Sequence, residues 1–270
     1  MKRLAPAILL GLLAGFQGGL FGVGGGIVLV PGMVLFLAVP QHRAHATSLA
    51  AMIFSTSAAV VPLAMDNRID WDFAGILAAG AIVGAYLGAR LFARIPEVWL
   101  AGGFLVVAVA SAVRMLLEAD ATGGAASGTT SLDASWIGVL GLFVIGFIAG
   151  VLGAVMGVGG GIVTVPALVT LYAFEQHLAQ GTSLAVIIPT ALVATITHGR
   201  RGQVDWRLAA TLVIGGLGGG WLGGHTALAI DGKVLRILFV CFLLLMVGRM
   251  LVRTWRRSRS ATQKLEESEV

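Results

Sequence analysis

The stretch GVGGGIVLVP, residues 22–31, returns almost unchanged as GVGGGIVTVP at residues 157–166. The second copy follows the first at an offset of 135 positions (157 − 22), which is half of the 270-residue chain. Three consecutive glycines allow the backbone to turn sharply and to expose its N–H groups. We therefore expect two similar turns that together form a site at the interface between two repeats.

The repeat covers far more than the glycines. The same offset pairs residues 41–42 with 176–177, 47–50 with 182–185, 70–71 with 205–206, and 114–116 with 249–251. Self-similarity at a fixed offset is the sign of a repeat architecture. We divide the chain into a first transmembrane repeat at 1–118, a linker at 119–135, a second transmembrane repeat at 136–253 and a basic, cytoplasmic tail at 254–270.

The composition places this chain in a lipid bilayer. It is 57% hydrophobic and only 11% charged, whereas about a quarter of the residues of a soluble domain are charged. The net charge of +5 does not indicate a nucleic-acid partner, because the basic residues flank apolar runs, where positive-inside sorting explains them. The partners that we expect are the bilayer and a small transported molecule, with a coupled proton as a further option.

The usual catalytic patterns are missing from the sequence. It contains no His-Glu-x-x-His pair, no Gly-x-Ser-x-Gly elbow, and no phosphate-loop lysine after the glycines. The single Cys241 excludes a cysteine metal cluster. We therefore expect neither an enzyme nor a cofactor or metal site.

Each half is predicted to contain five helical segments, so the fold class is an all-α polytopic membrane protein. The segments of the first half are expected at about 4–21, 26–39, 46–64, 73–93 and 97–117. The second segment is too short to cross: a dozen residues reach about 20 Å, against a hydrocarbon thickness of about 30 Å. We expect it to form a re-entrant hairpin with the first segment, with the glycine turn inside the membrane and shielded by protein.

Five segments in each half predict that the second half runs opposite to the first, the inverted repeat common in transporters. A cytoplasmic N-terminus would place most of the 18 Lys and Arg residues on the inner side. We therefore expect both termini in the cytoplasm.

The glycine turns are the candidate binding site. If Ile27 and Ile162 begin helices, the preceding N–H groups lie at the positive ends of helix dipoles, where an anion binds favourably. The alternative is that these glycines only allow close helix packing. The candidate substrate-binding residues are Gly24, Gly25, Gly26, Thr47, Ser48, Gly159, Gly160, Gly161, Thr182 and Ser183. The hydroxyls are expected to open the third segments, one of each pair capping a helix and the other completing the anion shell.

Other repeated residues are more simply explained by structure. Glycines spaced by four, at 80, 84 and 88 and again at 215, 219 and 223, are expected to pack helices closely. Asp70-Trp71 and Asp205-Trp206 are expected to anchor the fourth segments, with proton coupling as the alternative. A histidine could carry a coupled proton, and the sequence does not select which one.

With these motifs the chain resembles the sulfite exporter TauE/SafE family of bacterial membrane permeases. The resemblance rests on the doubled Gly-x-Gly-Gly-Gly-x-x-x-x-Pro block at 22–31 and 157–166, and on the hydroxyl motifs at 46–49 and 181–184 that follow it. It implies a carrier in the bacterial inner membrane for small sulfur-containing anions, such as sulfite, sulfoacetate or related organosulfonates.

Our interpretation is a secondary transporter that moves such an oxyanion by alternating access. The alternatives are an anion channel and a non-transporting membrane assembly protein. The repeats differ where Gln180 replaces His45 and Gln203 replaces Arg68, so a site that includes these positions is not symmetric. The sequence indicates neither the direction of transport nor the oligomeric state.

Overall fold

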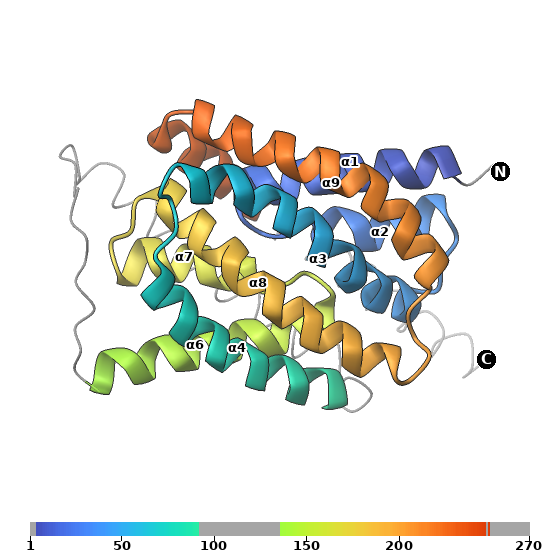
Figure 1. The fold of residues 1–270 in the computed structure, drawn as a ribbon, viewed down its shortest axis with the longest axis horizontal. Coiled ribbons are helices and arrows are strands. Elements are labelled where there is room, and N and C mark those ends of the chain that lie inside the picture. Colours follow the sequence, from blue (N-terminus) through green and yellow to red (C-terminus); the bar gives the residue numbers. More distant parts are fainter. Residues whose placement is uncertain (1–3, 92–135, 247, 249–270) are drawn as a thin grey trace, which may run out of the picture.

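The computed structural model describes residues 4–91, 136–246 and 248, and all regular secondary structure within them is helical. The helices are α1 (Leu4–Phe21), α2 (Gly26–Phe36), α3 (Gln41–Met65), α4 (Trp71–Leu91), α6 (Trp136–Met156), α7 (Gly161–Leu171), α8 (Gln176–Gly199) and α9 (Trp206–Ala229) (Figure 1). Residues 232–246 are also helical. The expected segment at 97–117, the linker at 119–135 and the tail at 254–270 lie outside the described residues.

Five described helices are long and apolar enough to cross a membrane, namely α1, α3, α4, α6 and α8. α9 is not among them by that measure, although it is the repeat counterpart of α4. α9 is nevertheless long, with 24 residues. The first, third and fourth helices of each repeat are thus the long ones, as predicted.

α2 and α7 are the short helices that the sequence predicts. Each has 11 residues, which corresponds to about 17 Å and is less than the hydrocarbon thickness of about 30 Å. α2 returns antiparallel along α1, because Gly18 lies against Gly25 and Gly32 lies against Leu10. The first two helices thus form a re-entrant hairpin, and the repeat gives α6 and α7 the same arrangement.

The two repeats are inverted. α1 and α9 run parallel, since Gly11 packs on Leu212 and Gly19 packs on Gly220. α8 runs opposite to α3, because it begins beside Arg68, just beyond the end of α3. In Figure 1, α1, α3 and α9 run from right to left, and α4, α6 and α8 run from left to right. Each long helix described in the first repeat, α1, α3 and α4, therefore runs opposite to its counterpart in the second.

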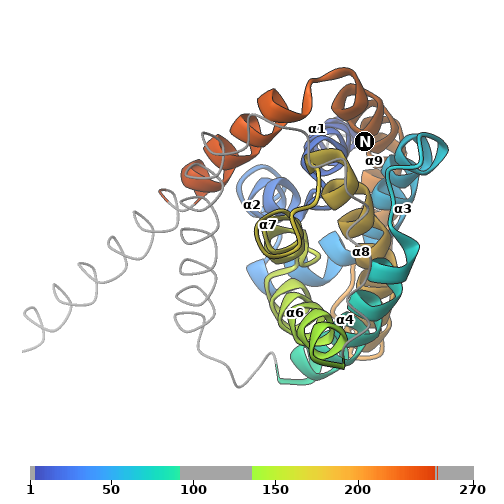
Figure 2. The same ribbon diagram turned by 90° about the vertical axis from the view of Figure 1, so that its left-hand side faces the viewer.

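The repeats also exchange helices. α1 packs on α9 on one side of the molecule, and α6 packs on α4 on the opposite side (Figure 2). The glycines spaced by four make both contacts: positions 80, 84 and 88 of α4 lie on α6, and positions 215, 219 and 223 of α9 lie on α1. A Cβ at Gly84 would be only 2.1 Å from the Phe147 carbonyl oxygen. The prediction that these glycines pack helices is confirmed.

The third helix of each repeat begins earlier than predicted. α3 starts at Gln41 and not at residue 46, and α8 starts at Gln176. The apolar pattern does not mark these starts, because the first turns are polar. Pro40, with φ −55°, precedes the first turn of α3, and a proline before the first helical turn costs no backbone hydrogen bond there.

The aspartates cap the fourth helices. The Asp70 carboxylate accepts hydrogen bonds from the N–H groups of Asp72 and Phe73. The Asp205 carboxylate accepts one from Leu208 N–H at the start of α9. These contacts agree with the anchoring interpretation of both Asp-Trp pairs.

Candidate functional site

Both glycine turns have a backbone conformation that favours glycine. The φ angles are 83° and 84° at Gly24 and Gly25, and 84° and 83° at Gly159 and Gly160. Gly25 and Gly160 are the N-cap residues of α2 and α7. A glycine cap supplies no side-chain oxygen to the first N–H groups of the helix, which are therefore available to another acceptor.

The two turns meet inside the molecule. A Cβ at Gly26 would be 2.1 Å from the carbonyl oxygen of Gly157, and one at Gly161 would be 2.4 Å from that of Gly22. Val23, between the glycines of the first turn, is completely buried. The sequence predicts this meeting of the two turns.

The serine hydroxyls bind the turn of the opposite repeat. Ser183 of α8 donates to the Gly22 carbonyl oxygen at 2.9 Å, and its oxygen lies 2.8 Å from that of Thr164. Ser48 of α3 lies 2.9 Å from the Gly157 carbonyl oxygen and 2.7 Å from that of its own helix at His45. In this structure both serines therefore fix the shape of the turns.

The threonine hydroxyls bind the start of the fourth helix in the opposite repeat. Thr47 accepts a hydrogen bond from Asp205 N–H, and Thr182 accepts one from Asp70 N–H, each at 3.0 Å. Both threonines are completely buried. They lie in the second turns of α3 and α8, so the expectation that they open these helices is wrong. The actual helix starts are polar turns that precede the apolar run.

Two apolar side chains fill the space beside both turns. Met52 of α3 and Ile187 of α8 are repeat counterparts and are completely buried. A Cβ would be 2.5 Å from the Met52 Cε at Gly24 and 2.3 Å from it at Gly159, and Ile187 packs against both positions as well. Sequence reasoning missed this pair, because an apolar residue in an apolar run gives no signal beyond its position in the repeat.

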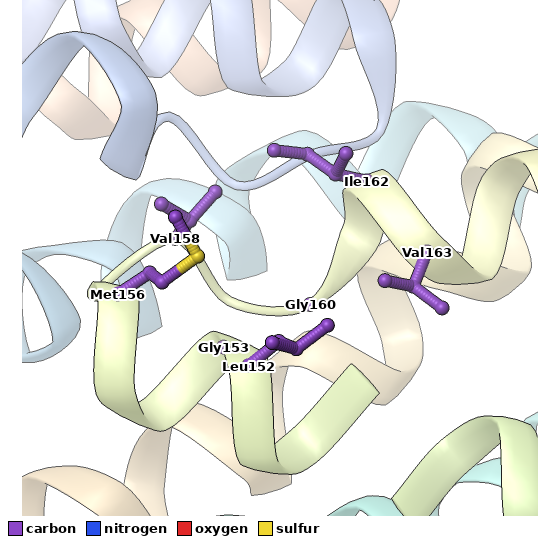
Figure 3. A pocket seen from close by; sticks show the side chains of 7 residues that line it. All are labelled: Leu152, Gly153, Met156, Val158, Gly160, Ile162 and Val163. Atoms are coloured by element: carbon purple, nitrogen blue, oxygen red, sulfur yellow. The ribbon is translucent and has the colours of Figure 1, made fainter. Parts of the chain in front are cut away.

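A small apolar cavity adjoins the second turn. Its volume is about 10 Å³, and Leu152, Met156, Val158 and Ile162 are among the side chains that line it (Figure 3). This is about the volume that one water molecule needs, and a water also needs polar partners. The second turn is therefore apolar on the side that faces this cavity.

Different side-chain contacts lie at the two ends of the antiparallel helices α3 and α8. At the end of α3, the Arg68 guanidinium binds Glu175 at 2.7 Å and Asp66 at 3.1 Å. The hydrogen bond to Asp66 raises the pKa of Arg68 above its usual value, outweighing the opposing effect of burial. At the opposite end Gln203, the counterpart of Arg68, binds the buried His198 ring at 2.7 Å. An ionic contact at one end thus corresponds to a neutral one at the other.

Several histidines bind main-chain carbonyls at helix ends. His45 Nδ1 lies 2.6 Å from the Met156 carbonyl oxygen. His177 Nε2 lies 3.1 Å and 3.0 Å from the carbonyl oxygens of Ala227 and Ile230. These contacts give the buried His177 ring and the partly buried His45 ring protein partners. Among the described residues there is no group of three or more His, Cys, Asp or Glu side chains that could hold a metal ion.

Long apolar helices, inverted repeats and two paired re-entrant hairpins define the class of polytopic membrane transporters. Comparison with protein families agrees. The chain matches the family described as "Sulfite exporter TauE/SafE" over residues 7–155 and 142–269. It belongs to this family, and the two matched stretches fall on its two halves.

The relatives carry similar names. The chain is 28% identical over 272 residues to the probable membrane transporter protein YunE of Bacillus subtilis, covering 91% of this chain and 96% of the relative. It is 29% identical to a probable membrane transporter protein of Xylella fastidiosa, covering 83% and 84%. Sulfite exporter TauE/SafE family protein 3 of Arabidopsis thaliana is 36% identical over 85 residues, 32% of this chain and 18% of that protein. No solved structure is a significant match.

Proposed function

We propose that this protein is a secondary transporter that moves small sulfur-containing oxyanions across the bacterial inner membrane by alternating access. The cargo class comprises sulfite, sulfoacetate and related organosulfonates. The observation that carries the proposal is the contact between the turns of two inverted hairpins, where the starts of α2 and α7 lie together inside the protein. Inverted-repeat transporters bind their substrates at such repeat interfaces, near the middle of the bilayer.

The chemistry of the turns suits an oxyanion. The N–H groups at Gly25–Gly26 and Gly159–Gly161 are donors at the positive ends of α2 and α7. The Gly24 N–H donates to the Gly18 carbonyl oxygen at 3.5 Å in this structure and would join them only after leaving that partner. Ser48 and Ser183 now donate to turn carbonyls, and each can donate to the anion instead when the turns separate. Thr47 and Thr182 would support the site by holding the starts of the fourth helices.

The packing of the turns favours a carrier over a channel. Met52 and Ile187 lie directly against both turns, so an anion reaches the helix starts only after these side chains move. The contacts at the two ends also differ, with Arg68 and Glu175 at one and His198 and Gln203 at the other. Ends that can open separately are what alternating access requires.

The experiment is uptake of labelled sulfite and a panel of small sulfonates into liposomes that contain the purified protein, with and without a pH gradient. We expect saturable uptake of at least one panel member and stimulation of labelled uptake by unlabelled anion inside, which is counterflow. An effect of the pH gradient would indicate the coupled proton. Flux that does not saturate and shows no counterflow would indicate an anion channel. No flux through folded protein would favour a non-transporting assembly role.

A further inference from the structure

Two buried carboxamides distinguish the first glycine turn from the second. Gln180 of α8 is completely buried, and its Cβ and Cγ lie 2.9 Å and 3.0 Å from where Gly22 would carry a Cβ. Gln176, four residues earlier and so on the same face of α8, is 3% exposed. Neither the nitrogen nor the oxygen of either side-chain amide has a hydrogen-bond partner among the described residues.

The repeat provides an internal comparison. The counterparts of Gln176 and Gln180 are Gln41 and His45, which lie 3.4 Å apart through Nε2 atoms, and His45 Nδ1 also binds the Met156 carbonyl oxygen. At these two positions of α3, polar side chains therefore find protein partners. At the same two positions of α8, the side-chain amides of Gln176 and Gln180 do not.

Gln17 is a third buried amide that has no polar counterpart in the other repeat. Gln17 of α1 precedes Gly18, which lies against the first turn, and both polar atoms of its side-chain amide are buried without a partner. Its counterpart is Leu152, which lines the apolar cavity beside the second turn. One unpaired amide, that of Gln180, thus lies against the first turn, and two more lie on the helices that contact this turn, α1 and α8. The corresponding residues of the other repeat are apolar, at Leu152, or paired, at Gln41 and His45.

Buried polar groups in proteins are nearly always hydrogen-bonded, to the chain, to water or to a ligand. A carboxamide offers two N–H donors without introducing a charge, so it can bind an oxyanion in a low-dielectric site without a buried cation. In this structure the Gly22 carbonyl oxygen already accepts a hydrogen bond from Ser183 and so does not pair with the amide N–H groups. The remaining groups at the first turn are then mainly donors.

We propose that Gln180, supported by Gln176, hydrogen-bonds the oxygens of the transported oxyanion, so that the side-chain amide contacts of the anion are made on the side of the turn between α1 and α2. This inference rests on the proposed function, in which the chain carries a small oxyanion. It makes Gln180 a specificity-determining residue: an anion with several oxygens uses both amide donors, whereas a halide cannot bridge them.

The test compares Gln180→Met with the wild type in the proteoliposome uptake assay, with thermal stability measured on the same preparations. Methionine has nearly the same shape as glutamine and no amide. We expect the apparent KM for the transported anion to rise about tenfold to a hundredfold, as for the loss of hydrogen bonds to a charged group. The melting temperature should stay level or rise, because the variant no longer buries an unpaired amide. Gln180→His, with the ring that the other repeat carries, should recover part of the affinity.

The control is Gln41→Met, the same change at the counterpart of Gln176, which should leave KM within about twofold because the Gln41 amide already has a protein partner in His45. If Gln180→Met does not fold, Gln180→Asn decides the question, since it withdraws the amide by one methylene. An unchanged KM in a folded variant at position 180 overturns this inference and leaves the proposed transport intact. If the wild type neither transports nor binds any anion of the panel, the proposed function fails and this inference fails with it.

Discussion

The contact between α4 and α6 allows a quantitative test of the fold. A Cβ added at Gly84 would be 2.1 Å from the Phe147 carbonyl oxygen and 3.0 Å from Val151 N. Ordinary contacts begin at 3.4 Å, so the two helices would have to separate locally by about 1.3 Å. Both atoms belong to the backbone of α6 and cannot rotate away. We therefore expect Gly84→Ala to be destabilising.

The matched control lies on the same helix. Gly75 has nothing within 4 Å of its Cβ position. Both substitutions replace glycine by alanine inside α4 and gain the same helix propensity, about 1 kcal/mol, so this gain cancels in the comparison. The remaining difference is the cost of overpacking, about 1–3 kcal/mol.

The assay is the apparent melting temperature of the purified variants in one detergent. We expect Gly84→Ala to melt roughly 2–10 °C below Gly75→Ala, using the dependence of melting temperature on stability for chains of this size. Equal or higher stability of Gly84→Ala would refute the close parallel packing of α4 on α6. The inverted, exchanged arrangement of the repeats would then lose one of its two supports.

Three further predictions follow from single contacts. Ser183→Ala removes the donor to the Gly22 carbonyl oxygen and should cost about 1–3 kcal/mol in a melting experiment. Ser57→Ala, which loses only a bond within its own helix, should cost less than half as much, and equal losses would contradict the role assigned to Ser183. Arg68→Gln should lower stability by less than about 1 kcal/mol, because its contact with Glu175 is partly exposed; a larger loss would mean that this contact holds the fold. A reporter fused to either terminus should show activity in the cytoplasm, as the distribution of basic residues predicts; activity outside would reverse the topology.

Much of this architecture could be predicted from the repeat. The offset of 135 between 22–31 and 157–166 predicts two similar turns and a short helix after each. The expectation of five segments in each half, with a second segment too short to cross, predicts the inversion. The glycines spaced by four predicted close helix packing, because a backbone approach of about 2 Å to a Cβ position tolerates no other residue. These features are local patterns with one physical solution, which is why they can be read without a structure.

The details of the site could not be predicted in the same way. The roles of Ser183 and Thr182 depend on contacts with the other repeat, and no spacing within one repeat shows which groups lie opposite. Met52 looks like any apolar residue of a membrane helix until both turns are seen against it. The predicted third segment begins at residue 46 and leaves out the polar first turn of α3, because hydropathy marks the apolar run and not the start of the hydrogen-bonded helix.

The exchange of helices between repeats has a consequence for biogenesis. The ribosome delivers α1 (Leu4–Phe21) to the membrane well before its packing partner α9, which begins only at Trp206. Through most of synthesis the face of α1 that contains Gly11 and Gly15 therefore lacks its protein partner. Neither half can complete its packing alone, so the helices must insert first and associate late, in the two separate stages typical of membrane-protein folding. A chain whose synthesis stopped after the first repeat would form an incompletely packed helix bundle and not an independent domain.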